Sequence, residues 1–570
     1  MTLTSQQPRS TNYWEPVVVG AFVFVVLLAT SFQLPLTWDE PNAILRSENL
    51  QDWASSWIFR AADTPAPWTN EGVQKGCPYT TQIEGHPTGY GLLIALGRSL
   101  TSQFLPAKES NRFGPMGLFA VACSAVYVRL RRSHDKGTAL SAIAFLLLMP
   151  RLFAHAHFAT TDGPLMSAWI ILWASFDWAL VSWRRLTVWG MWLGYVMSCK
   201  FTGWIAVIPF LAWSTVQRDT KMFLKVLVGT YVGFWMFVLL NPTLWHDLPG
   251  GIERFFELAF SRRELGPNVP TMFLGQVYDL HHPLPWYNTT LWILFTVPPA
   301  TLIFAGIGFI SDLKQPNMRS GLVLILLNWL VLVVVRALPW APPHDAIRLW
   351  LPSFPFLAVL AGIGFSASLS WAKVGCLPRW SPLRRALAVA ILGCGLVNMI
   401  LCNPQWLSYY SPLIGGVVGA ERVGLEPTYY WDGFDSDVHD WLDDHCQPRD
   451  QVYCHVSNEY CDFWNRTNVK NYKLQCNNPE QCNWILVQNR PGHMTSVDKY
   501  LTANLSPAFV KRFSGGAFDR VFSSEKVPIA WVYSREQYLS AKLHAVELLS
   551  IQRDSEQNAT GANVNRGHYR

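Results

Sequence analysis

Charged residues are scarce in this chain of 570 residues. Asp, Glu, Lys and Arg together make up 15% of the residues, whereas soluble domains carry about a quarter. Hydrophobic residues account for 50%, and 28 residues are Trp. This composition excludes an ordinary soluble globular protein for most of the length and predicts a membrane protein. The net charge of +6 forms no patch of the kind that binds nucleic acid.

Familiar catalytic motifs are also missing. The chain has no P-loop, no His-Glu-x-x-His and no Gly-x-Ser-x-Gly sequence, which are the signatures of nucleotide, zinc-protease and α/β-hydrolase chemistry. Cysteines are few before residue 403, but the remainder of the chain holds Cys446, Cys454, Cys461, Cys476 and Cys482. Their spacing does not match a zinc site. We favour disulfides in an oxidising compartment over metal binding, with one cysteine left over or paired with Cys77 or Cys402.

Apolar runs bounded by charged residues predict about eleven transmembrane helices. They cover residues 16–36, 113–130, 138–154, 164–182, 187–199, 201–216, 222–240, 289–310, 320–336, 349–368 and 385–402. The first run is followed by no convincing cleavage site, so we interpret it as a retained span and not as a signal peptide.

Cations predict the orientation of these spans. Lys and Arg concentrate in alternate short loops, at 129–136, 184–185, 218–225, 314–319 and 373–385. By the positive-inside rule these loops and residues 1–15 are cytoplasmic, and the carboxyl-terminal segment is outside. Residues 187–216 can also be read as one long span, but two short spans keep the cations on one side and let Lys200 reach water.

Three long segments then lie on the outer side, at residues 37–112, 241–288 and 403–570. In the first, residues 89–105 read as an interfacial helix. The last has a helical pattern at 437–445 and strand patterns at 451–456 and 484–487. The predicted fold is therefore a polytopic α-helical membrane protein: a catalytic transmembrane domain at 16–402 with a small α/β domain at 403–570.

Two adjacent carboxylates, Asp39 and Glu40, stand at the outer end of the first span. Charges at a membrane boundary are costly and often functional. A partly desolvated carboxylate has a raised pKa and suits a general base that takes a proton from a hydroxyl. The alternative is a pair of helix-terminal charges at the headgroups.

A second acidic position, Asp162, follows His155 and His157 and precedes Pro164, which suits the first turn of a helix. Asp162 is either an N-cap or a second carboxylate that faces the same outer cavity as Asp39. With the nearby imidazoles it could hold a divalent cation or position an acceptor. The motif His155-x-His157 is weak evidence for a metal, so metal binding stays open.

Two cations interrupt apolar segments and could bind a phosphate. Lys200 lies in a hairpin, and Arg348 opens the tenth span. A leaving phosphate needs positive donors, and Arg supplies a two-pronged one. The alternatives are snorkelling or an internal pair such as Arg348 with Asp345. Arg262 and Arg263 are weaker loop candidates.

The order of these motifs resembles the GT-C superfamily of membrane glycosyltransferases, in the branch of the protein O-mannosyltransferases and lipid A aminoarabinose transferases. The resemblance covers about residues 10–425. It rests on Asp39-Glu40, Gly85-His86-Pro87, Thr161-Asp162-Gly163-Pro164, Cys199-Lys200-Phe201-Thr202-Gly203, His282-Pro283-Leu284-Pro285-Trp286-Tyr287, His344-Asp345-Ala346-Ile347-Arg348 and the stretch from Leu407 to Gly416.

This resemblance implies inversion at a sugar carbon, with a polyprenyl-phosphate sugar as donor and a hydroxyl on a protein, lipid or polysaccharide as acceptor. It implies that Asp39 is the base, with Glu40 beside it and Asp162 across the cavity. Lys200, Arg348 and His86 would bind the donor phosphate, although the related transferases often have a stronger base where His86 stands. His155, His157 and His344 are further candidates for contacts to substrate in the cavity. No cofactor is assigned.

Two other functions remain as alternatives. A transporter or flippase for lipid-linked sugars should show two related halves with interrupted helices, and no such internal repeat is visible. A non-catalytic scaffold protein should not need the intact Asp39.

Overall fold

The computed structural model describes residues 13–59, 64–77, 79–80, 85–261, 264, 268–371 and 381–545. The loop candidates Arg262 and Arg263, and parts of the predicted end segments 1–15 and 403–570, lie outside these ranges.

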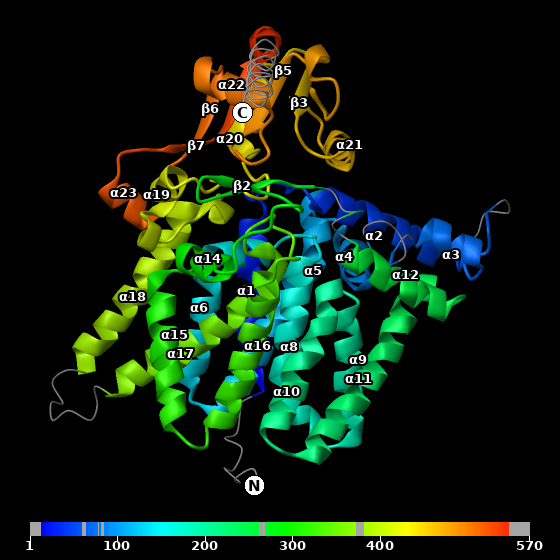
Figure 1. Ribbon diagram of the computed structural model, residues 1–570, viewed down its shortest axis with the longest axis vertical. Helices are drawn as coiled ribbons and strands as arrows, with labels where there is room; N and C mark the ends of the chain where they lie inside the picture. The colour runs from blue at the N-terminus through cyan, green and yellow to red at the C-terminus, as the bar shows by residue number, and fades with distance from the viewer. Residues whose placement is uncertain are drawn as a thin grey trace, which may run out of the picture.

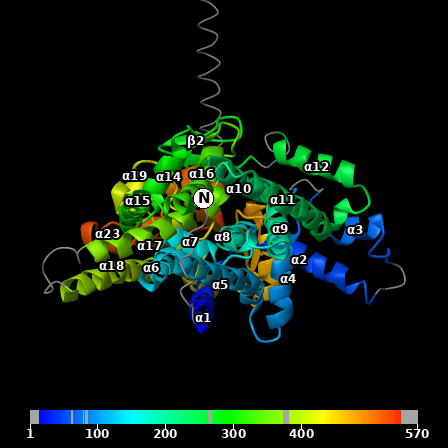
Figure 2. The ribbon, with the colours of Figure 1, turned by 90° about the horizontal axis from the view of Figure 1, so that it is seen from below.

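The molecule consists of a bundle of long helices with a smaller α/β unit at one end (Figure 1). The bundle consists of α1 (Trp14–Ser31), α5 (Ala107–Ser133), α6 (Lys136–Leu147), α7 (Pro150–His155), α8 (Asp162–Ala179), α9 (Trp183–Met197), η1 (Phe201–Val207), α10 (Ile208–Val216), α11 (Thr220–Leu240), α14 (Asn288–Thr296), α15 (Pro299–Lys314), α16 (Arg319–Ala337), η3 (Arg348–Ser353), α17 (Phe354–Trp371) and α18 (Ser381–Cys402). Seen from below, α5 and α8 lie near the middle, α6 and α17 lie between them and α18, and α1 lies at the edge against α5 (Figure 2).

Shorter elements gather at the end of the bundle that faces the α/β unit (Figure 1). They are α2 (Glu40–Ser55), α3 (Asn70–Gly76), α4 (Gly89–Thr101), η2 (Pro242–Leu244), α12 (Leu248–Phe260) and the hairpin of β1 (Thr271–Phe273) and β2 (Gln276–Tyr278). Helix α4 occupies most of the segment that was expected to be an interfacial helix.

Every predicted span coincides with helix, and the chain is a multi-pass membrane protein. Within the described ranges, five segments are individually long and apolar enough to cross a membrane: α1, α5, α11, α16 and the continuous stretch Arg348–Ser370. The pair α14 and α15 also qualifies together but is bent by 114°. The count of eleven therefore stays a prediction. The expected break at Lys200 is present, because α9 ends at Met197 and η1 begins at Phe201.

The α/β unit is built around a five-stranded mixed sheet with strand order β4-β3-β5-β7-β6. Its elements and the connecting turns are η5 (Trp406–Ser408), η6 (Pro412–Ile414), α19 (Gly416–Arg422), α20 (Ser436–His445), β3 (Gln451–Cys454), α21 (Asn458–Thr467), β4 (Lys473–Gln475), η7 (Pro479–Gln481), β5 (Trp484–Gln488), α22 (Ser496–Asn504), β6 (Phe509–Phe513), α23 (Ala517–Phe522) and β7 (Val527–Ser534). Strand β3 is parallel to β4 and β5, and Cys461 is bonded to Cys476. The thiols of Cys446, Cys454 and Cys482 are free.

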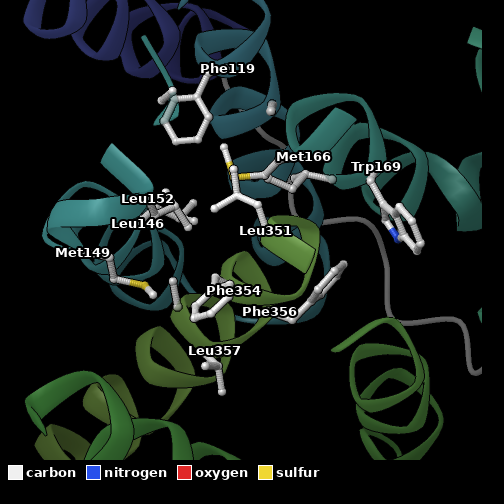
Figure 3. Close-up of a cluster of buried hydrophobic side chains, with 14 of the residues drawn as sticks. Phe119, Leu146, Met149, Leu152, Met166, Trp169, Leu351, Phe354, Phe356 and Leu357 are labelled. Carbon is white, nitrogen blue, oxygen red and sulfur yellow. The ribbon is translucent and has the colours of Figure 1, made fainter. Parts of the chain in front are cut away.

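A buried apolar cluster fixes the helices that carry the candidate site (Figure 3). Leu351 of η3 and Phe354 of α17 meet Met166 of α8, and residues of α5, α6 and α7 surround them. In a membrane, close van der Waals packing of such side chains holds helices together, because lipid is as apolar as the side chains themselves. The cluster therefore sets the position of η3 relative to α8, and with it the distance between Arg348 and Asp162.

Two glycines allow α15 and α17 to cross closely. A Cβ atom added at Gly364 would collide with the carbonyl oxygen of Phe304, and one added at Gly308 would collide with that of Leu360. Small residues at such crossings let helix backbones approach each other in membranes.

We expect Gly364→Leu to destabilise the bundle by about 1–3 kcal/mol, because the helices must separate to admit the side chain. The measurement is the thermal unfolding midpoint in detergent. Gly306→Leu is the matched control on α15, since nothing lies within 4 Å of a Cβ atom there. Equal midpoints for the two variants would contradict this packing account.

Candidate functional site

Four predicted residues from distant parts of the sequence meet at the end of the bundle below the α/β unit. Asp39 precedes α2, Asp162 is the first residue of α8, Lys200 lies in the break between α9 and η1, and Arg348 opens η3. Each of them stands at the start of a helical segment or just before one, where the chain leaves the apolar part of the bundle.

Arg348 lies between the two acidic positions. Its Nη1 atom forms an ion pair with Asp39 and lies 3.5 Å from Oδ2 of Asp162. The other oxygen of Asp162 accepts a hydrogen bond from Lys200 Nζ at 2.6 Å. Asp162 therefore faces two cations, and the structure places Asp39, Asp162, Lys200 and Arg348 in one cluster.

Exposure separates the two carboxylates. The side chain of Asp39 is 40% exposed, whereas that of Asp162 is 2% exposed. Arg348 and Lys200 expose 9% and 12%. Asp39 is thus the carboxylate that an incoming molecule can reach, while Asp162 lies behind the cations and orients them.

Tyr430 completes the cluster and was not predicted. Its hydroxyl donates to Oδ2 of Asp39 at 3.1 Å and accepts from Arg348 Nη1 at 3.0 Å. The Arg348 guanidinium also lies 4.5 Å from the centroid of the Tyr430 ring. An aromatic pair, Tyr429-Tyr430, after the last span was the available signal, but its position in the fold was not readable from the sequence.

The turn before Arg348 is strained. Asp345 and Ala346 both have positive φ angles, of 61° and 45°, a region that costs non-glycine residues of order 1–3 kcal/mol each. Asp345 forms ion pairs with Arg348 and with Arg490, whose Nη2 lies 3.0 Å from Asp345 Oδ1. Burial alone would raise the pKa of Asp345, but these two guanidinium groups hold it well below its usual range.

A further buried carboxylate lies next to Arg490. Oε2 of Glu426 is 3.4 Å from Arg490 Nε, and Oε1 accepts from the backbone N–H groups of Met272 and Gly492. Burial raises the pKa of Glu426 to about 7, and Arg490 opposes this shift only in part. Glu426 therefore changes charge near neutral pH.

Glu40, predicted as a catalytic partner of Asp39, is fully buried. Its carboxylate accepts two hydrogen bonds of 2.7 Å from Arg112. It also accepts from the Thr37 backbone N–H at 3.0 Å, the Thr37 hydroxyl at 3.1 Å and the Ala159 N–H at 3.0 Å. These bonds fasten the turn that carries Asp39 to α5 and to the loop before Asp162.

The two cavity histidines of the predicted motif point to different partners. His155 Nε2 lies 2.6 Å from the Tyr429 hydroxyl, whereas His157 Nε2 lies 2.9 Å from the hydroxyl of Thr30. Burial lowers the pKa of His344 to about 3, so its imidazole is neutral. His86 packs edge-on to Tyr90 at a centroid distance of 6.4 Å.

Within the described residues, no three His, Cys, Asp or Glu side chains are grouped so as to hold a metal ion. In the cluster itself, cationic side chains stand between the carboxylates.

We expect Glu426→Gln to weaken the pH dependence of stability between about pH 4.5 and 7. Because the folded-state pKa is raised, Glu426 favours the folded state at low pH, and this contribution is lost as pH rises through 7. The loss is on the order of 3 kcal/mol. Unfolding midpoints at pH 5 and 8 measure it, with the exposed Glu257→Gln as control. An unchanged pH dependence in Glu426→Gln would contradict the assignment.

Arg112→Met should cost about 3–5 kcal/mol of stability, because it leaves the buried Glu40 charge without its partner. Lys75→Met is the control: it breaks the exposed pair with Glu71 and should cost less than about 1 kcal/mol. Denaturant unfolding of the purified variants measures both. Similar small losses in the two variants would show that Glu40 does not depend on Arg112.

Comparison with known proteins bears on the identity of this site. Residues 85–246, which include His86, Asp162 and Lys200, match the family described as dolichyl-phosphate-mannose-protein mannosyltransferase. No curated protein matches the chain.

Solved structures of two proteins are similar at low identity. ArnT from Cupriavidus metallidurans bound to undecaprenyl phosphate has 14% identity and a TM-score of 0.47, over 91% of this chain and 98% of that chain. Its apo form has 13% identity and a TM-score of 0.48 over the same shares. The Archaeoglobus fulgidus oligosaccharyltransferase tethered to an acceptor peptide has 12% identity and a TM-score of 0.43, over 84% and 69%.

None of these structural scores is high enough to transfer a function. The family match covers residues 85–246, so Asp39 and Arg348 lie outside it, and over that range it confirms the resemblance that the motifs indicate. The chain is a multi-pass membrane protein that resembles the GT-C superfamily of glycosyltransferases.

Proposed function

We propose that this protein is an inverting glycosyltransferase that moves a sugar from a polyprenyl-phosphate donor to a hydroxyl acceptor at the outer face of the membrane. The observation that carries the proposal is the ion pair of the half-exposed Asp39 with the buried Arg348. It puts a proton acceptor and a phosphate-binding cation side by side. Glycosyl transfer from a phosphate needs both groups at one place.

In the reaction, Asp39 takes the proton of the acceptor hydroxyl. The hydroxyl oxygen forms a bond to the anomeric carbon while the bond from that carbon to the phosphate oxygen breaks. The electron pair stays on the phosphate, and polyprenyl phosphate leaves. Attack from the face opposite the leaving group inverts the sugar carbon.

Arg348 has to change partners during this cycle. While Arg348 is paired with Asp39, the guanidinium is not free to bind a phosphate and Oδ2 of Asp39 is occupied. A donor phosphate competes with Asp39 for the guanidinium, which binds phosphate with two parallel hydrogen bonds. Donor binding thereby frees Asp39 and couples the presence of donor to the activity of the base.

The other residues of the cluster support these two. Lys200 supplies a second cation to the phosphate, and Asp162 holds Lys200 and Arg348 in place. We assign Glu40 the structural role of anchoring the turn of Asp39, in place of a catalytic one. His86, His155 and His344 remain candidates for contacts to donor or acceptor, whereas His157 faces α1.

The predicted topology of eleven spans agrees with this use of the site. The loops joining α10 to α11 and α15 to α16 lie at the end of the bundle opposite the α/β unit (Figure 1). Arg218 lies in the first loop, and the adjoining helix ends carry Lys221, Lys314 and Arg319. By the positive-inside rule that end is cytoplasmic. The site and residues 403–570 are then outside, where the acceptor is a protein, lipid or polysaccharide.

The test is the release of polyprenyl phosphate from a panel of polyprenyl-phosphate hexoses and pentoses in reconstituted vesicles. We expect Asp39→Asn to lower release by about 10²-fold or more, since general-base catalysis contributes this much. Glu48→Gln is the control: it changes a carboxylate on α2 that pairs with Arg466 on the surface.

Donor that crosses the bilayer intact, equally in wild type and Asp39→Asn, would contradict the proposal and favour a transporter. Equal release of polyprenyl phosphate by both proteins would contradict the role of Asp39 as the base, but not the glycosyltransferase activity.

A further inference from the structure

Arg490 has no part in the mechanism above, yet it is one of the most deeply buried charged residues of the chain, at 2% exposure. It lies two residues after β5, at the carboxyl end of a strand that runs parallel to β3. This end of the sheet faces the bundle, and Arg490 extends from the α/β unit to the turn before Arg348.

The guanidinium of Arg490 is held on several sides. Its Nη2 atom binds Asp345 Oδ1 at 3.0 Å, and its Nη1 atom donates to the Tyr429 carbonyl at 2.9 Å. Its plane lies 3.9 Å from the centroid of the Trp431 ring. A planar guanidinium that makes several hydrogen bonds fixes the directions of its partners, whereas a flexible ammonium group does not.

Asp345 divides its two oxygens between two arginines. Oδ1 binds Arg490 and Oδ2 binds Arg348. The backbone of Asp345 and Ala346 is in the left-handed region, which persists only where surrounding contacts enforce it. Arg490 is a contact from outside the turn to the Asp345 side chain itself, whereas Arg336 of α16 binds the backbone carbonyls that precede it.

The same segment of the chain also reaches the other half of the catalytic ion pair. Trp431, on which Arg490 stacks, lies 4.2 Å from the ring of Trp38, the residue before Asp39. Tyr430 bonds to both Asp39 and Arg348. Both members of the ion pair are therefore positioned by residues that follow the last span.

We propose that Arg490 is a positioning residue through which the α/β unit aims Arg348 at the donor phosphate, by way of Asp345. This inference rests on the proposed function. It makes the α/β unit a working part of the active site, in addition to any role in recognising the acceptor.

The test is a double-mutant cycle on kcat/KM for donor cleavage, with Arg490→Met, Asp345→Asn and the double variant. Each single change should lower kcat/KM by about 10–100-fold, the scale of a misplacement of about 1 Å. The double variant should be no worse than the more damaging single one, because both changes break the same chain of contacts. Arg490→Lys keeps the charge and should recover part of the loss.

Arg466→Met is the matched control. It also breaks an ion pair between the α/β unit and the bundle end, with Glu48 on α2, but that pair is exposed. Its kcat/KM should stay within about twofold of the wild type, since exposed pairs contribute little.

Losses that multiply in the double variant, or an Arg490→Met protein as active as the wild type, would overturn the inference. If Arg490→Met does not fold, Arg490→Lys provides the test. Full wild-type activity in Arg490→Lys would contradict the inference. A loss of activity in Arg490→Lys that does not increase when Asp345→Asn is added would support it. A wild type that cleaves no donor contradicts the proposed function itself. An active wild type with an inactive Asp39→Asn and an indifferent Arg490 contradicts this inference only.

Discussion

The structure depends on the placement of one guanidinium among three carboxylates. Asp39, Asp162 and Asp345 converge from separate parts of the chain, and Arg348 lies within ion-pair distance of all three. Three like charges so close together repel one another unless cations stand between them. Lys200 binds the second oxygen of Asp162, and Arg490 binds the second oxygen of Asp345. The three carboxylates are thus paired with three cations. In the proposed mechanism a phosphate displaces one carboxylate from Arg348, and we propose Asp39 because its side chain is the most exposed of the three.

Contacts further from the cluster hold Arg348 and the carboxylates in place. The apolar cluster around Leu351 and Met166 fixes η3 against α8 (Figure 3). The buried pair of Glu40 and Arg112 fixes the turn of Asp39. A buried pair of this kind gives little net stability but requires both partners, which suits a device that holds geometry. The α/β unit closes the arrangement from the other side through Tyr430 and Arg490. Bundle and α/β unit therefore share one site and are not independent modules.

Much of the candidate site was predictable from the sequence, and the reason is local. Asp39, Asp162, Lys200 and Arg348 each interrupt an apolar helix pattern, so a charge at that position stands out. The sequence did not distinguish Glu40 from these residues, because a carboxylate that binds Arg112 and one that faces a substrate look alike in sequence. The positions of Tyr430 and Arg490 in the site could not be predicted from the sequence. Both lie in segments of mixed polarity, where an aromatic or charged residue is unremarkable, and their roles depend on the packing of the α/β unit onto the bundle. The apolar pattern also did not settle the number of spans. It does not show whether short and bent helices such as α14 and α15 cross the membrane.

In the proposed mechanism Arg348 exchanges Asp39 for the donor phosphate. Binding of polyprenyl phosphate, without a sugar, to purified protein in nanodiscs measures this exchange. We expect Arg348→Met to weaken binding by about 10-fold or more, the effect of losing a charged hydrogen bond of about 1.5–3 kcal/mol. We expect Asp39→Asn to bind polyprenyl phosphate at least as tightly as the wild type, because the competing carboxylate is gone. Unchanged affinity in Arg348→Met, or clearly weaker binding in Asp39→Asn, would contradict the exchange.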